Sequence, residues 1–131
     1  MRNFAFAFLI LAGCSGQQPR GECGKSFCLP ADAKIIARLT PVEDFNFYRM
    51  NWHGHLVEIY EGNQPMKRPE ATSTTVKLPI NSASTLRLYE GGGSILIRMG
   101  DDWPEFLEVL GPCSSPKQCP VASFAAELSR R

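Results

Sequence analysis

Residues 45–60 read FNFYRM, NWHGH and LVEIY in succession, and this stretch decides the fold. Phe45–Met50 and Leu56–Tyr60 are short runs rich in aromatic and branched apolar residues, with polar residues between them. Such runs are typical of β-strands that are buried on one face. Gly54 lies in the connecting segment Asn51–His55 and accepts positive φ easily. The pattern predicts a β-hairpin with a loop of five residues.

A second hairpin is predicted further along the chain. Thr85–Glu90 and Ser94–Met99 are two more β-prone runs, and Gly91, Gly92 and Gly93 separate them as a turn. A turn at Asp101–Pro104 precedes Glu105–Leu110, which is the last strand that the pattern predicts.

The segments outside these hairpins are less regular. Lys34–Thr40 fits a strand or a helical turn, and we favour the strand. Residues 62–75 are polar and contain two prolines, which predicts a loop. Val76–Ile80 alternates, but Pro79 cannot donate to a ladder, so we expect an edge strand there. Val121–Arg130 has helical spacing, and we expect Phe124 and Leu128 to dock this helix on the sheet.

Together these elements predict a mainly β fold. We expect a small antiparallel sheet, or a sandwich or barrel built from hairpins, with a short C-terminal helix. At 131 residues the chain falls within the usual size of one domain, which we place at residues 23–131.

The five cysteines divide into one and four. Cys14 has an explanation of its own, given below, and the other four predict two disulfides in an oxidising compartment. Among the three connectivities that four cysteines allow, we favour the two local pairs, because thiols close in sequence meet more often in an unfolded chain. The four are Cys23, Cys28, Cys113 and Cys119.

Composition and charge exclude some functions. Hydrophobic residues at 44% and charged residues at 21% are typical of a folded globular chain. The 14 basic residues include Arg2, and without it 13 basic residues face 13 acidic ones. We therefore expect no nucleic-acid partner, since such binding depends on clustered Lys and Arg.

The N-terminus has the layout of an export signal. A basic start at Arg2 precedes the apolar run Phe4–Ala12, which is too short to span a bilayer as a helix. Leu11-Ala12-Gly13-Cys14 follows, and this segment resembles the lipobox of bacterial lipoproteins. The resemblance implies that a signal peptide of residues 1–13 is removed and that the Cys14 thiol carries lipid, which would hold the chain to a membrane.

The lipobox resemblance also implies a location. Residues 14–22 are polar after the cysteine, and we expect them to form a flexible, lipidated tether. Ser15 stands where enterobacterial lipoproteins that stay in the inner membrane carry Asp, which favours the outer membrane, facing the periplasm. The partner that this predicts is the membrane itself.

Few residues indicate catalysis. His53 and His55 are the only histidines, and with Glu58 or Glu61 they form a weak candidate for a metal site. Surface turn histidines without a metal are commoner, so we assign no cofactor and no catalytic residue. Gly24-Lys25-Ser26 lacks the earlier glycine of a phosphate loop, and Asp101 with Asp102 fits a solvated turn.

The aromatic residues around the first hairpin suggest binding. Trp52, Tyr48 and Tyr60 form either a ligand face for an envelope protein or glycan, or a part of the core, with Trp52 in the loop the most exposed.

We therefore expect a non-enzymatic binding or structural lipoprotein of the bacterial envelope. The alternatives are a metal-dependent envelope hydrolase that uses His53 and His55, and a lipoprotein subunit of an assembly or secretion complex.

Overall fold

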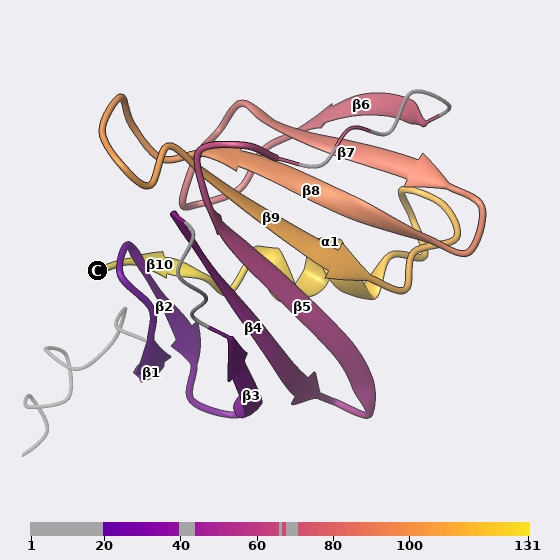
Figure 1. Cartoon of the computed structure of the whole chain (residues 1–131). Helices are drawn as coiled ribbons and strands as arrows, with labels where there is room; N and C mark the ends of the chain where they lie inside the picture. Colours follow the sequence, from indigo (N-terminus) through magenta and orange to yellow (C-terminus); the bar gives the residue numbers. More distant parts are fainter. Residues whose placement is uncertain (1–19, 40–43, 66, 68–70) are drawn as a thin grey trace, which may run out of the picture.

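The computed structural model describes residues 20–39, 44–65, 67 and 71–131 (Figure 1). The predicted signal peptide, Cys14 and residues 15–19 of the tether lie outside these ranges. Within them, no helix is long and apolar enough to cross a membrane.

The fold contains two antiparallel sheets and one short helix, so the mainly β prediction is confirmed (Figure 1). The smaller sheet has the order β1-β2-β10, with β1 at Arg20–Cys23, β2 at Phe27–Pro30 and β10 at Ser129–Arg130. The larger sheet has seven strands and does not close into a barrel; in spatial order they are β3 (Lys34–Leu39), β4 (Phe45–Trp52), β5 (His55–Gly62), β9 (Phe106–Gly111), β8 (Gly92–Arg98), β7 (Ser84–Tyr89) and β6 (Thr72–Val76).

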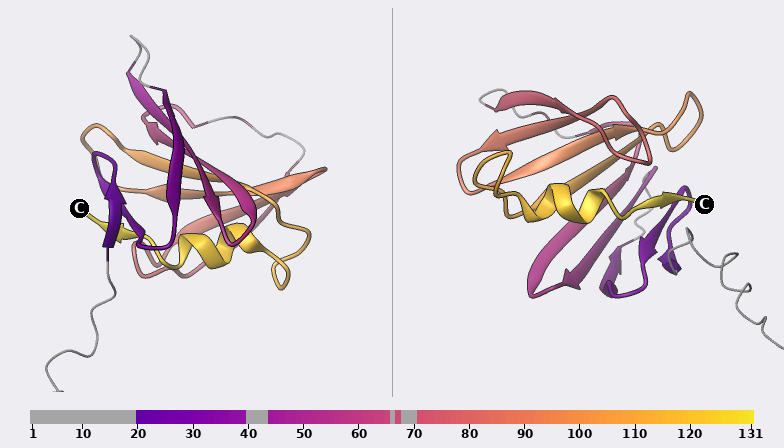
Figure 2. Two further views of the ribbon diagram at one scale, coloured as in Figure 1. Left: turned by 90° about the horizontal axis from the view of Figure 1, so that it is seen from below. Right: turned by 180° about the vertical axis from the view of Figure 1, so that it is seen from behind.

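Both predicted hairpins are present, and β9 lies between them. β4 pairs with β5, β7 pairs with β8, and β9 pairs with β5 on one side and β8 on the other. The chain that leaves β9 therefore emerges between the two hairpins. It continues into the helix α1 (Pro120–Ala125), which contacts β8 and β9, and then into β10 (Figure 2).

One face of the large sheet forms the core. Met50, Val57 and Ile59 of the first hairpin are fully buried, as are Ile95 and Val109 of the neighbouring strands. The small sheet and α1 cover this face and contribute Phe27, Leu29, Val121 and Phe124 to the same cluster, and Leu128 joins it from the link between α1 and β10. Phe124 and Leu128 thus dock the C-terminal segment as predicted, because the apolar face of the sheet needs such a cover.

The C-terminal helix is shorter than the predicted Val121–Arg130. It ends at Ala125, and residues 129–130 instead pair with β2 as strand β10. The main-chain N–H of Arg131 donates to the carbonyl of Ser26 at 3.1 Å, and its guanidinium donates to the carbonyl of Gly24 at 2.9 Å. The last residues thus form a strand rather than continue the helix, because they pair with an edge of β2 that would otherwise be free.

Two other predictions are wrong in their boundaries. The edge strand is β6, at Thr72–Val76 rather than Val76–Ile80, so the predicted loop at 62–75 contains most of a strand. Leu78 and Asn81 exchange main-chain hydrogen bonds across a turn that holds Pro79 and buries Leu78 and Ile80. The turn buries these two side chains without a strand, so their alternation along the chain did not indicate one.

The end of the predicted tether also has a different structure. Residues 20–22 belong to β1, which pairs with β2 and is joined to it by the Cys23–Cys28 disulfide. Glu22 accepts hydrogen bonds from Ile35 and from the Arg38 guanidinium. These polar residues therefore form a strand, because the disulfide holds them beside β2 and hydrogen bonds from β3 hold Glu22.

The disulfides confirm the prediction of local pairs. Cys23 is bonded to Cys28 and Cys113 to Cys119, with Cα atoms 4.0 Å apart in each pair. The first closes the β1–β2 hairpin, and the second closes the loop between β9 and α1.

A fully buried carboxylate connects the two sheets. Glu61 follows Val57 and Ile59 on the inward face of β5 and is 0% exposed. Its Oε1 accepts hydrogen bonds from the Tyr48 hydroxyl (2.7 Å), the Asn46 amide (3.1 Å) and the main-chain N–H of Lys25 (3.2 Å). Its Oε2 accepts from the Ser26 N–H (2.7 Å) and hydroxyl (2.6 Å). One side chain thus ties the β1–β2 turn to the first hairpin.

The environment of Tyr48 reflects this network. Burial raises the pKa of the Tyr48 phenol far above its ordinary value of 10.0, and the hydrogen bond to the Glu61 carboxylate raises this pKa further. Tyr48 therefore stays a donor to Glu61 throughout the physiological pH range.

We expect Glu61→Gln to lower the free energy of unfolding by about 2–3 kcal/mol, since an amide replaces one acceptor with a donor in a buried cluster of donors. Urea denaturation followed by circular dichroism measures this difference. Glu58→Gln is the matched control, because among the described residues Glu58 pairs with the half-exposed Arg49 alone, and it should cost less than about 1 kcal/mol. Equal losses in the two variants would contradict a connecting role for Glu61.

Candidate binding groove

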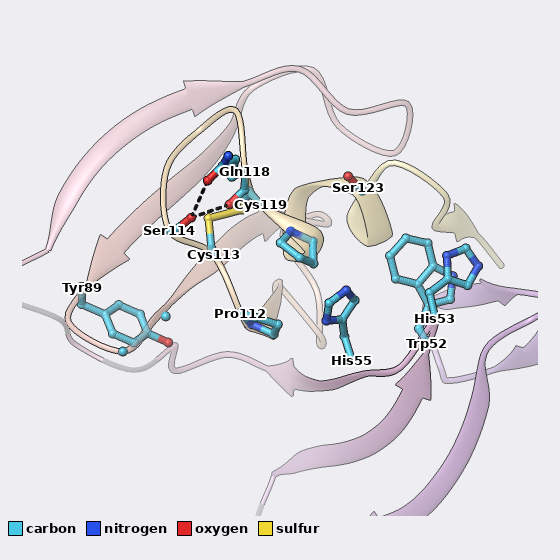
Figure 3. A pocket seen from close by; sticks show the side chains of 13 residues that line it. Trp52, His53, His55, Tyr89, Pro112, Cys113, Ser114, Gln118, Cys119 and Ser123 are labelled. Carbon is cyan, nitrogen blue, oxygen red and sulfur yellow. Dashed lines mark hydrogen bonds between the residues drawn. A yellow bond between two sulfur atoms is a disulfide. The ribbon is translucent and has the colours of Figure 1, made fainter.

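A groove of about 900 Å³ lies at the turn end of the hairpins (Figure 3). We call it the hairpin-tip groove. Its lining comes from three places that are distant in sequence: the β4–β5 turn, the β7–β8 turn and the segment from β9 to α1. The lining residues are Trp52, His53, His55, Tyr89, Gly91, Gly92, Pro112, Cys113, Ser114, Gln118, Cys119, Pro120 and Ser123.

The strand order explains why these segments meet. Because β9 lies between the two hairpins, the chain after β9 emerges between their turns. The Cys113–Cys119 disulfide and a main-chain hydrogen bond from Ser114 to Gln118 (3.0 Å) hold this chain in a closed loop. Gly93 lets the loop approach β8, since a Cβ at this position would lie 2.8 Å from the Cβ of Cys113.

The chemistry of the groove is neutral and mixed. The lining residues include rings of Trp, Tyr, His and Pro, together with the hydroxyls of Ser114 and Ser123 and the amide of Gln118. Among the described residues that line it, none is Asp, Glu, Lys or Arg. Such a surface suits an uncharged ligand that combines apolar groups with hydrogen-bonding ones.

The β4–β5 turn is tighter than predicted. It has two central residues, His53 and Gly54, and both have positive φ, at 50° and 81°. A two-residue hairpin turn of the I′ type requires this conformation. Consequently Trp52 belongs to β4 and faces the core, where it is 4% exposed, so its predicted exposure in a loop is wrong.

Trp52 supports the turn from inside. Its ring packs edge-on against Phe124 of α1 at 5.3 Å and lies under the His53 ring at 4.1 Å. Its indole N–H donates to Asp32 Oδ1 at 3.3 Å, and the other oxygen of Asp32 accepts from His53 Nε2 at 2.6 Å. Asp32 thus fixes the imidazole over the indole.

The metal site predicted from the sequence is not assembled in the described residues. Figure 3 shows that His53 lies flat against Trp52, whereas His55 projects separately into the groove. Glu58 is engaged with Arg49, and Glu61 is buried in the connection between the sheets. No group of three or more His, Cys, Asp and Glu side chains suited to a metal ion occurs in the described part of the chain.

The three aromatic residues of the predicted ligand face do not share a face. Trp52 only underlies the groove, and Tyr48 is 5% exposed and points to Glu61. Tyr60 lies on the opposite face of the large sheet from Tyr48, because the two occupy positions of different parity in the β4–β5 register. Tyr60 is mostly buried and reaches a separate pocket at the other end of the hairpin.

The other motifs have structural roles. Lys25 and Ser26 present their main-chain N–H groups to the Glu61 carboxylate rather than to a phosphate. Gly91 forms the β7–β8 turn with φ at 92°, while Gly92 and Gly93 belong to β8. Asp101 forms an exposed ion pair with Arg98.

Several important residues could not be found from sequence reasoning. Asp32 contacts His53 and Trp52 across 20 residues or more, and no local pattern indicates such a contact. Tyr89 and Gln118 join the groove only because β9 brings their loops together. Glu61 did leave a signal: it is a charged residue at an inward position of an alternating strand.

Comparison with protein-family models, with curated proteins and with solved structures finds no match for this chain.

The Asp32–His53 pair makes a testable electrostatic prediction. The hydrogen bond from His53 holds the pKa of the Asp32 carboxyl below its ordinary value of 3.8. The pair therefore contributes stability above pH 3.8, and this contribution is lost as the pH falls through the lowered pKa of the folded state.

We expect His53→Ala to raise the Asp32 pKa toward 3.8, as measured by NMR titration of the Asp32 carboxyl carbon. His55→Ala is the control and should leave this titration unchanged, because His55 makes no hydrogen bond to Asp32. A shift of the Asp32 pKa in the His55 variant alone would refute the assignment.

Proposed function

We propose that this chain is a lipid-anchored protein of the bacterial envelope that binds a polypeptide segment of an envelope partner in the hairpin-tip groove, without catalysis. The lipobox-like segment ending at Cys14 supports the anchor, since a thiol there is the attachment point that the resemblance implies. The observation that carries the binding role is the groove itself: it has a volume of about 900 Å³, none of its described lining residues is Asp, Glu, Lys or Arg, and one of its three segments is closed by the Cys113–Cys119 disulfide.

The groove chemistry favours a polypeptide. Main-chain amides are uncharged and need both donors and acceptors, which Ser114, Gln118 and Ser123 supply. The rings of Tyr89, Pro112 and Pro120 offer apolar surface for the intervening side chains. The described cysteines in the lining are bonded to each other, so neither provides a free thiolate for nucleophilic chemistry.

The position of the groove suits an anchored domain. In Figures 1 and 2 the described chain begins at β1 and ends at β10 on one side of the molecule, whereas the two hairpin turns and the loop between β9 and α1 lie on the opposite side. An anchor that precedes β1 would leave the groove facing away from the bilayer, where a partner can reach it.

Lipidation of Cys14 predicts the fractionation of the full chain. In a bacterial host, the native chain should fractionate with membranes and carry a diacylglyceryl thioether, because two or more acyl chains make membrane attachment durable. Cys14→Ser should release the protein into the soluble fraction. Mass spectrometry of the mature N-terminus tests the modification directly, and a serine variant that stays with membranes would contradict it.

Site-specific photocrosslinking tests the groove. Ser123, which is exposed and lines it, is replaced by p-benzoylphenylalanine in the membrane-anchored protein, and irradiation should give one protease-sensitive adduct. An excess of unmodified mature protein should compete this adduct away, since binding at one groove is saturable. The same replacement at Ser82, which is exposed in the turn before β7, should give no adduct. A protease-resistant adduct, or equal adducts at both positions, would overturn the proposal.

A further inference from the structure

A second pocket lies at the other end of the β4–β5 hairpin. It has a volume of about 580 Å³, within the range of roughly 300–1,000 Å³ that small-molecule sites occupy. Its lining residues are Asp44, Phe45, Tyr60, Asn63, Gln64 and Trp103. We call it the aromatic pocket, because three rings from three different elements meet in it.

Hydrogen bonds within the fold hold these rings in place. The Trp103 indole N–H donates to the carbonyl of Asp44 at 2.7 Å, which ties the loop between β8 and β9 to the start of β4. The Tyr60 hydroxyl accepts the main-chain N–H of Gln64 at 2.7 Å. Phe45 lies against Tyr60 with ring centroids 5.6 Å apart. The pocket is therefore formed in advance of any ligand.

The rim of the pocket carries polar groups with unused hydrogen-bonding capacity. The Asp44 carboxylate and the Gln64 side-chain amide are exposed, and neither has a hydrogen bond or ion pair within the described part of the chain. The Asn63 amide oxygen accepts the N–H of Glu105 at 3.0 Å, and its NH₂ group makes no hydrogen bond to the described residues.

The aromatic rings that line the pocket and the polar groups on its rim together match the chemistry of one class of ligand. A pyranose ring has an apolar face of C–H groups that packs on an aromatic ring, and a periphery of hydroxyls that both donate and accept hydrogen bonds. A carboxylate accepts from hydroxyls, and carboxamides do both. We infer that the aromatic pocket binds a neutral saccharide, with Trp103 and Phe45 against the sugar face and Asp44, Asn63 and Gln64 around its edge.

A cation is the other ligand that aromatic rings attract, and the surroundings disfavour it. Aromatic cages for quaternary ammonium groups depend on rings whose faces are free of other cations. Here the Lys25 ammonium lies over the Trp103 ring, 5.7 Å from its centroid. This charge repels a second cation beside the Trp103 ring.

This saccharide site is separate from the hairpin-tip groove. The two hollows lie at opposite ends of β4 and β5, which are eight residues long each, or about 25 Å. They share no lining residue. The saccharide site goes beyond the proposed function, and each can fail without the other.

The two tryptophans of the chain allow a direct test. Each gives one indole N–H signal in a ¹H–¹⁵N NMR spectrum, and Trp103→Phe identifies its own signal by removing it. Titration of the mature protein with N,N′-diacetylchitobiose should shift the Trp103 signal in a saturable way and leave the Trp52 signal unmoved, because Trp52 lies at the other end of the hairpin. Choline chloride, a quaternary ammonium probe, should shift neither signal.

Matched aspartate variants test the rim. Asp44→Asn should weaken the sugar affinity about tenfold, because it removes a charged acceptor from the hydrogen bonds to hydroxyls. Asp102→Asn removes another exposed carboxylate that does not line the pocket, and it should leave the affinity unchanged. The inference is wrong if neither N,N′-diacetylchitobiose nor cellobiose shifts the Trp103 signal up to its solubility limit, or if choline shifts this signal instead. It is also wrong if the two indole signals move together, or if the two aspartate variants bind the sugar with the same affinity.

Discussion

The buried carboxylate of Glu61 is the interaction on which the arrangement of the two sheets depends. A charge removed from water is tolerated only where hydrogen bonds replace those of the solvent. Glu61 obtains five such bonds, and three of them come from the β1–β2 turn. The turn can take no other position on the large sheet without leaving the carboxylate unsatisfied. Once β2 is fixed in this way, its free edge is available to the last residues of the chain, which is why β10 forms there.

The same constraint stiffens the hairpin that separates the two hollows. β4 and β5 pair along eight residues each, with a two-residue turn at one end and the Glu61 cluster near the other. β9 then pairs with β5 and brings the second hairpin alongside. Each hollow is therefore bordered by the ends of strands, and the loops that complete it are tied down by a disulfide at the groove and by the Trp103–Asp44 hydrogen bond at the aromatic pocket.

Sequence reasoning found what depends on local pattern and missed what depends on distant contacts. The alternation in both hairpins, the local disulfides and the docking of Phe124 follow from neighbours in the chain, and the structure confirms them, whereas both hairpin turns are shorter than predicted. The pairing of β10 with β2 could not be predicted, because its hydrogen bonds join residues about 100 positions apart. The predicted position of Trp52 is wrong for a smaller reason: the pattern predicts a loop of five residues, whereas His53 adopts positive φ beside Gly54 and shortens the turn to two residues.

Tyr48, Trp52 and Tyr60 of the first hairpin are close in sequence but lie in three different surroundings. In a strand, successive side chains point to opposite faces, so Tyr48 and Trp52 share the core face while Tyr60 lies on the other. Position along the strand then divides the core pair, since Tyr48 lies beside Glu61 and Trp52 beside the hairpin-tip groove. Residues that are close in sequence are thus separated in space, because alternate strand positions face opposite sides of the sheet and the strands are long. The aromatic pocket consequently forms at the ends of the strands, where rings from separate elements such as Tyr60 and Trp103 meet, rather than where aromatic residues are densest along the chain.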